Sequence, residues 1–126
     1  EPVAADDFYE TAVGLAPVRL AEHSEGTVPL PSVRVNAETI PDLIPLSSAE
    51  RMRMLPAGAD SAGHPVNHGC LALPGDRFEE LRSRLEEQAV PVSDLSYDSF
   101  GARGAARRSF YFRDPDGNIV EARHYE

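Results

Sequence analysis

The sequence predicts a single α+β domain that contains a βαβββ module twice, with the leading strand of the first module missing. In residues 67–126 the apolar patterns follow the order strand, helix and three strands. Residues 1–46 show a helix and then about three strands, which is the same order without its first element. Residues 47–66 are rich in Pro, Gly and small polar residues, as is typical of a connector. A chain of 126 residues is long enough for one such domain and too short for two independent ones.

The first module begins with a short amphipathic helix, predicted over Ala4–Leu15. Three apolar residues share one face of it: Phe8, Ala12 and Leu15. Three acidic residues are expected on the polar side: Asp6, Asp7 and Glu10. A Gly near the end of the segment favours its termination there.

A loop rich in Glu and Gly follows the helix, and a β-hairpin is predicted after it. Polar and apolar residues alternate over residues 32–35, and residues 36–38 offer a turn into residues 39–45. Pro41 and Pro45 cannot donate hydrogen bonds to a ladder, so the second strand should be irregular or at an edge.

The second module opens with a strand over residues 68–73, and a helix follows its closing Pro-Gly pair. Asp76 and Glu79, three residues apart, have the capping-box spacing of a helix start. The buried stripe of this helix is predicted from apolar spacings of three and four: Phe78, Leu81 and Leu85.

Three short strands are predicted after this helix, over Ala89–Val92, Ser109–Arg113 and Ile119–Tyr125. The intervening sequence Asp-Pro-Asp-Gly-Asn at residues 114–118 is a strong turn signal. The Gly- and Ala-rich segment before Ser109 is predicted as a loop.

Because side chains alternate across a strand, these strands divide into two faces. One face is almost wholly apolar and should lie under the helix: Leu71, Leu73, Phe110, Phe112, Val120 and Ala122. The other face gathers an imidazole and a carboxylate: His68, Cys70, Ser109, Tyr111, Ile119 and Glu121. Burying either group is costly unless something pairs with it, so this second face is the candidate site.

Charge and cysteine content exclude several classes of partner. Twelve basic and twenty-one acidic residues give a net charge of −9, which repels nucleic acid and anionic membranes. No apolar run is long enough to span a membrane. The one cysteine, Cys70, excludes an internal disulfide and a Cys-x-x-Cys pair. A cytoplasmic protein is therefore predicted.

Several motifs together resemble the vicinal oxygen chelate superfamily, which includes glyoxalase I, extradiol dioxygenases, fosfomycin-resistance transferases and bleomycin-resistance proteins. They are Asn67-His68 at the start of a strand, Gln-Ala-Val-Pro-Val at residues 88–92 and Ser-Phe-Tyr-Phe-Arg-Asp-Pro-Asp-Gly-Asn-Ile-Val-Glu at residues 109–121. Residues 7–15 are similar to the first helix of the family, so the resemblance covers nearly the whole chain.

The resemblance implies a cup-shaped sheet made from two βαβββ modules, with a divalent metal ion held inside it. His68 and Glu121 match the family's ligands on the first and last strands of the second module. An imidazole and a carboxylate with open coordination positions suit Fe, Mn, Ni, Zn or Co. Asp42 lies near the acidic ligand of glyoxalase I in the first module, and it is a candidate ligand or catalytic base.

The family's first-module His lies on a strand that precedes the first helix, and this sequence begins after that strand. Either the sequence is truncated or the site is incomplete, and the simultaneous lack of the strand favours truncation.

The resemblance implies a metal-dependent enzyme that acts on a small molecule with two adjacent oxygens. A glyoxalase-type lyase or isomerase, a dioxygenase and a thiol transferase remain open, and the alternative is a metal-free binding protein of the bleomycin-resistance type. Three residues are predicted to contact a polar or anionic substrate: Tyr111, Cys70 and Arg103, the last with Arg107 and Arg108. His23, His64 and His124 are expected to be structural or exposed. A homodimer is predicted, because an incomplete module leaves strand edges to be covered.

Overall fold

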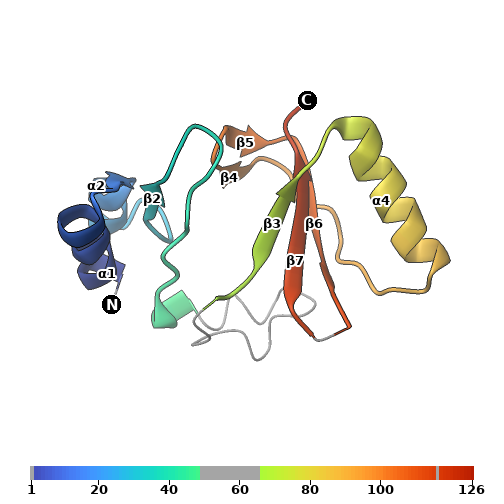
Figure 1. Ribbon diagram of the computed structural model, residues 1–126, viewed down its shortest axis with the longest axis horizontal. Helices are drawn as coiled ribbons and strands as arrows, with labels where there is room; N and C mark the ends of the chain where they lie inside the picture. The colour runs from blue at the N-terminus through green and yellow to red at the C-terminus, as the bar shows by residue number, and fades with distance from the viewer. Residues whose placement is uncertain (1, 49–65, 116) are drawn as a thin grey trace. The chain divides into compact units, whose positions relative to one another are not determined.

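The computed structural model describes residues 2–48, 66–115 and 117–126 (Figure 1). The chain divides into two compact units, Glu1–Ser48 and Ala49–Glu126. Each contains helices and strands, and strand pairing is both parallel and antiparallel, which confirms the predicted α+β class. Most of the predicted connector, with His64, lies outside the described residues.

The first unit begins with helix α1 (Pro2–Phe8), which continues directly into the π-helical turn η1 (Tyr9–Val13). Gly14, at φ 80°, ends it, so the predicted extent of the helix is confirmed. Its predicted faces are wrong. Phe8 is 57% exposed, whereas Asp6 is fully buried. The π turn also rotates the residues after Phe8 out of the 3.6-residue register on which the apolar stripe depends, whereas Asp6 and Phe8 lie before it, in α1.

Burial of the Asp6 carboxyl has an electrostatic consequence. Burial raises the pKa of Asp6, and the nearby carboxylates of Glu10 and Asp7 raise it further. The helical periodicity of the sequence does not show this, because it places all three acidic residues on the solvated side.

Strand β1 (Ala16–Val18) pairs antiparallel with β2 (Ser32–Arg34). The segment between them was predicted as a loop, but it contains the short helix α2 (Leu20–Ser24). The predicted hairpin is confirmed by backbone bonds from Val35 N to Thr39 O and from Val33 N to Pro41 O, both 3.0 Å. Its return segment forms isolated bridges only, as the prolines require, and a turn of 3-10 helix (η2, Leu46–Ser48) follows.

The second unit contains a three-stranded sheet in the order β3-β7-β6 (Figure 1). Strand β3 (Gly69–Ala72) runs parallel to β7 (Ile119–His124), and β6 (Arg108–Arg113) runs antiparallel to β7. Helix α4 (Gly75–Glu87) follows β3 directly. A separate hairpin of β4 (Ser99–Gly101) and β5 (Gly104–Ala106) precedes β6.

Three details of this unit differ from the prediction. Residues Ala89–Val92 form no strand, because Ala89 takes a left-handed φ of 56° and Val92 makes only one isolated bridge. The β4–β5 hairpin lies where a loop was predicted. The predicted capping box is absent, since α4 begins at Gly75 and the Asp76 carboxylate instead accepts from Arg77 N at 2.8 Å. The parallel β3–β7 pair and the chain order of β3, α4, β6 and β7 agree with the module, although the whole βαβββ arrangement stays a prediction.

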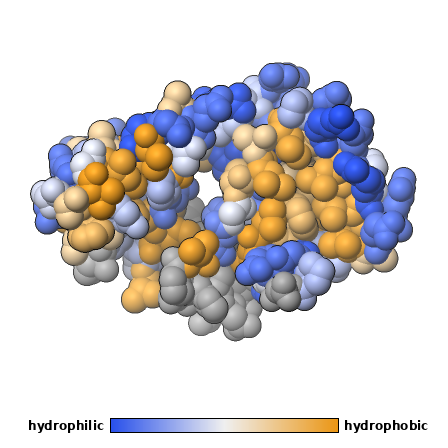
Figure 2. Space-filling view, viewed as in Figure 1, coloured by the Kyte–Doolittle hydropathy of each residue, from blue (hydrophilic) through white to orange (hydrophobic). Residues whose placement is uncertain are grey.

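The hydrophobic core of this unit lies between α4 and the sheet. Phe78 of α4 and Phe110 of β6 are fully buried with their rings 5.1 Å apart, and Ala122 of β7 completes the cluster. Six partly buried residues pack around it: Leu73, Leu81, Leu85, Val92, Leu95 and Phe112. Figure 2 shows apolar side chains gathered beside α4 and hydrophilic ones along its outer side. The predicted stripe is confirmed, and the apolar face is confirmed at Leu73, Phe110, Phe112 and Ala122, whereas Leu71 is 46% exposed.

The turn between β6 and β7 also matches its sequence signal. Gly117 takes a φ of 84°, and its N–H donates to Asp114 O at 3.0 Å. The Asp114 carboxylate accepts from the backbone and side-chain amides of Asn118, both at 2.8 Å. This closed turn fixes the register in which β6 and β7 pair.

The described part of the chain contains no helix that combines the length and hydropathy needed to cross a bilayer.

Candidate functional site

The register of the sheet in the second unit places one row of polar side chains across three strands. Glu121 of β7 stands opposite Cys70 of β3 and Tyr111 of β6. The next row, Leu71, Ala122 and Phe110, belongs to the α4 side. The predicted division of the strands into two faces is therefore confirmed.

His68 and Glu121 meet on the polar face. Their side chains place His68 Nε2 3.4 Å from Glu121 Oε2, and Glu121 is only 1% exposed. On the other side of the ring, His68 Nδ1 lies 2.7 Å from Asn67 Oδ1. This contact assigns the ring proton to Nδ1, because an amide oxygen only accepts.

This assignment leaves two lone pairs facing each other. With Nδ1–H donating to Asn67, the neutral ring presents the lone pair of Nε2 to a carboxylate oxygen. Two acceptors at this distance repel unless a cation lies between them, which is either a proton on Nε2 or a metal ion.

A second cation, the guanidinium of Arg123, also contacts the carboxylate. Arg123 Nη2 donates to Glu121 Oε1 at 2.7 Å, and Arg123 is 7% exposed. The two residues are i and i+2 on β7, so alternation places them on the same face. The sequence prediction missed Arg123, although this spacing was sufficient to find it.

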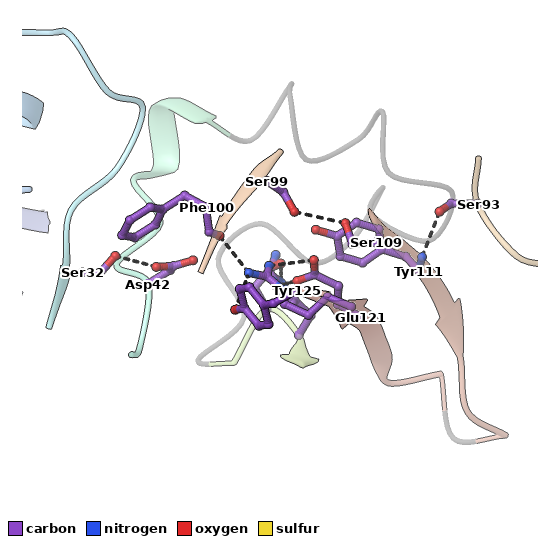
Figure 3. Close-up of polar contacts among 12 residues, drawn as sticks. Ser32, Asp42, Ser93, Ser99, Phe100, Ser109, Tyr111, Glu121 and Tyr125 are labelled. Carbon is purple, nitrogen blue, oxygen red and sulfur yellow. Dashed lines mark hydrogen bonds and ion pairs between the residues drawn. The ribbon is translucent and has the colours of Figure 1, made fainter. Parts of the chain in front are cut away.

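The strand pair β4–β5 and the chain end hold Arg123 in place. Its Nη1 donates to Phe100 O at 2.9 Å and to Tyr125 Oη at 3.4 Å. Figure 3 shows the polar contacts around Glu121, Tyr125 and Phe100. The guanidinium is thus fixed by three acceptors from separate parts of the chain.

Gly101 leaves the space that this guanidinium occupies. A Cβ at Gly101 would overlap Arg123 Nη1 and lie 2.9 Å from its Cζ. We expect Gly101→Ala to displace the guanidinium and lower the free energy of unfolding by about 1–3 kcal/mol. Urea denaturation measures it, with Gly69→Ala as the control, since a Cβ at Gly69 meets nothing within 4 Å. Equal stability of both variants contradicts the expectation.

The pKa of Glu121 lies below its ordinary value. Burial alone raises this pKa, but the neighbouring imidazole of His68 and the charge and hydrogen bond of Arg123 outweigh it. The carboxylate is therefore charged at neutral pH and available as an acceptor or ligand.

Cys70 and Tyr111 keep their protons at neutral pH. Desolvation of the thiol and the nearby Glu121 carboxylate raise the pKa of Cys70 to about 12, although the residue as a whole is exposed, and burial and the same carboxylate raise the pKa of Tyr111. A protonated thiol is a poor nucleophile, so Cys70 is suited to lining the face rather than to covalent chemistry. Tyr111 packs edge-on against the His68 ring, with centroids 5.5 Å apart.

The remaining predicted residues make other contacts. Asp42, in the first unit, is exposed and accepts a 2.5 Å hydrogen bond from Ser32 Oγ across the hairpin. The Arg103 guanidinium lies 4.6 Å from the centre of the Tyr125 ring. Arg108 pairs with Glu79 and donates to His124 Nε2 at 3.0 Å, so it lies on the α4 side, away from Glu121. His124 is buried there against Phe78, as a structural histidine.

Comparisons with known proteins give matches among solved structures. No protein family matches the chain, and no curated protein does. Lactoylglutathione lyase from Agrobacterium tumefaciens is 22% identical over 98% of this chain and 85% of that chain, with a TM-score of 0.34. TnmS3, an antibiotic binding protein from Streptomyces sp. CB03234, is 21% identical over 97% and 84%, with a TM-score of 0.35.

A third match, from Sphaerobacter thermophilus DSM 20745, is 21% identical over 98% of this chain and 88% of that chain, with a TM-score of 0.36. Its own name places it in the glyoxalase/bleomycin resistance protein/dioxygenase superfamily. This is the resemblance that the sequence motifs indicate.

The divalent ion that this superfamily implies fits the pair of His68 and Glu121. Metal bonds to imidazole nitrogen and carboxylate oxygen are about 2.0–2.2 Å long, so one ion can contact both atoms across their 3.4 Å gap. Within residues 2–48, 66–115 and 117–126, no three His, Cys, Asp or Glu side chains gather as a metal site. Of the described residues of the second unit, His68 and Glu121 are thus the two candidate ligands.

Proposed function

We propose that the protein is a metal-dependent enzyme of the vicinal oxygen chelate superfamily that acts on a small molecule with two adjacent oxygens. The single observation that carries the proposal is the facing of His68 Nε2 and Glu121 Oε2, two lone-pair donors 3.4 Å apart. A carboxylate and a neutral imidazole are donors that Fe, Mn, Ni, Zn and Co accept.

A bound divalent ion would polarise the oxygens of the substrate and stabilise negative charge on them. The protein's own residues prepare the site for that role. Asn67 fixes the tautomer of His68, and Arg123 holds Glu121 Oε1 so that Oε2 faces the imidazole. Tyr111, protonated and in contact with the His68 ring, is the candidate hydrogen-bond donor to a substrate oxygen.

The reaction we propose is a glyoxalase-type lyase or isomerase step, or a dioxygenation. Each of these uses a metal centre with open coordination positions, and two protein ligands leave such positions. Asp42 remains our proposal for a further ligand or base.

A second candidate function, metal-free binding of a small molecule, is favoured by one observation. The Glu121 carboxylate already has a positive partner in Arg123, at 2.7 Å. A proton on His68 Nε2 would donate to the other carboxylate oxygen and complete a hydrogen-bonded cluster around Glu121 without any metal.

Metal reconstitution separates the two functions. The chelator-treated protein is incubated with Fe²⁺, Mn²⁺, Ni²⁺, Zn²⁺ or Co²⁺, dialysed and analysed for its metal content. We expect about one ion per chain for at least one of these metals. No retained ion with any of the five supports the metal-free binding protein instead.

We also propose a homodimer. Among the described residues β3 pairs with β7 alone, and its four residues are exposed and uncharged, which is the kind of strand edge that a second copy covers. Light scattering at micromolar concentration is expected to give twice the chain mass, and a monomer contradicts the proposal.

A further inference from the structure

The charges on the polar face of the second unit suggest which ligands it admits. Glu121 and Arg123 both lie in the interior, at 1% and 7% exposure, and they contact each other directly. Their formal charges cancel, so this pair contributes no net charge to the site.

The other described groups that face this pair from the neighbouring strands are neutral. The neighbours of Glu121 on β3 and β6 are Cys70 and Tyr111, a thiol and a phenol rather than charged side chains, and His68 is neutral when it acts as a ligand. Ser109, opposite Arg123 on β6, is uncharged. Within the described part of this unit, nothing on that face therefore compensates the charge of a bound divalent ion.

We propose that Arg123 makes this site selective for anionic ligands, so that the substrate is a small molecule that carries negative charge on its metal-facing oxygens. This inference rests on the proposed metal-dependent function. A dication beside a charge-cancelled carboxylate gains no net compensation of its charge from the described residues of this unit, and it lies in a buried place, where charge is weakly screened. A ligand with a carboxylate or similar anionic oxygen compensates it, whereas a neutral ligand does not.

The overall charge of the chain does not favour anions. The net charge of −9 disfavours anions over most of the surface. Of the arginines that the sequence suggested for anion binding, Arg108 faces α4, where it pairs with Glu79. Arg123 is the described arginine that contacts the candidate metal ligand itself.

Oxalate and oxamide are suitable probes, because they have similar size and planarity but differ in charge. Zinc uptake is measured first, and then the affinity of the zinc-loaded protein for each probe is measured by calorimetry. In the wild type, oxalate is expected to bind more tightly. Arg123→Gln should reduce the oxalate-to-oxamide ratio of affinities by about tenfold, while zinc affinity rises because a neighbouring cation has gone.

Three further variants make the result specific. Arg123→Lys keeps the charge and should keep the preference for oxalate. Gly101→Ala leaves the arginine in the sequence but displaces its guanidinium, so it should weaken the preference in the same direction, even if Arg123→Gln does not fold. Arg77→Gln, on the exposed side of α4, is the control that should change neither measurement.

Two results overturn the inference in distinguishable ways. Zinc uptake with an unchanged ratio of probe affinities in Arg123→Gln or Gly101→Ala overturns anion selection alone. No zinc uptake by the wild type overturns both the proposed function and the inference that rests on it.

Discussion

Glu121→Gln is expected to weaken zinc binding by more than about 100-fold, since even residues that only orient a ligand change metal affinity by about 10–100-fold. A neutral amide is a much weaker donor to the metal than a carboxylate. In the metal-free protein the same change leaves the Arg123 guanidinium buried without its 2.7 Å partner, which costs about 3–5 kcal/mol. Calorimetric titration with zinc and urea denaturation measure the two effects.

Glu80→Gln is the matched control for this prediction. Glu80 pairs with Arg77 on the surface of α4, where its side chain is 53% exposed, so its loss should cost about 0–1 kcal/mol and leave zinc affinity unchanged. If Glu121→Gln loses stability but retains the zinc affinity of the wild type, the carboxylate is a structural partner of Arg123 and not a ligand.

Phe110→Ala is expected to lower the free energy of unfolding by about 3–5 kcal/mol. Its fully buried ring packs against Phe78 and lies under the Arg82 guanidinium, so truncation opens a cavity between α4 and the sheet. Urea denaturation followed by circular dichroism measures the change.

Phe8→Ala provides the comparison, since that ring is 57% exposed in α1 and its loss should cost less than about 0.5 kcal/mol. Similar losses in the two variants would show that the core does not lie where Phe78 and Phe110 meet.

The strand faces of the second unit could be predicted because their period is two and their turn is strongly encoded. Phe110 and Ala122 fall on one face and Tyr111 and Glu121 on the other by counting alone, and the turn at Asp114 fixes the register between them. His68 could be placed on the same face as Glu121 for the same reason.

Other features depend on interactions that a local pattern does not contain. Asp76 and Glu79 have capping-box spacing, yet the helix starts one residue before Asp76, after a proline, and Glu79 pairs with Arg108 of β6. Ala89 takes a left-handed conformation at the end of α4, which interrupts an apparent strand.

The role of Arg123 shows a different limit. Its position on the polar face follows from alternation, but its partners Phe100 O and Tyr125 Oη depend on the β4–β5 hairpin, which was predicted as a loop. The sequence predicted anion recognition by the arginines in the segment before Ser109. One of them, Arg108, faces the opposite side of the sheet from Glu121.

The central claim is that His68 Nε2 and Glu121 Oε2 face each other as two donors to one metal ion. Nitrogen-15 NMR of the histidine rings, before and after addition of zinc, tests it most directly. The account predicts that zinc shifts the Nε2 resonance of His68 to that of a metal-bound nitrogen while Nδ1 keeps its proton, and that the buried His124 on the opposite face does not change. A His68 Nε2 that stays protonated in saturating zinc would contradict it.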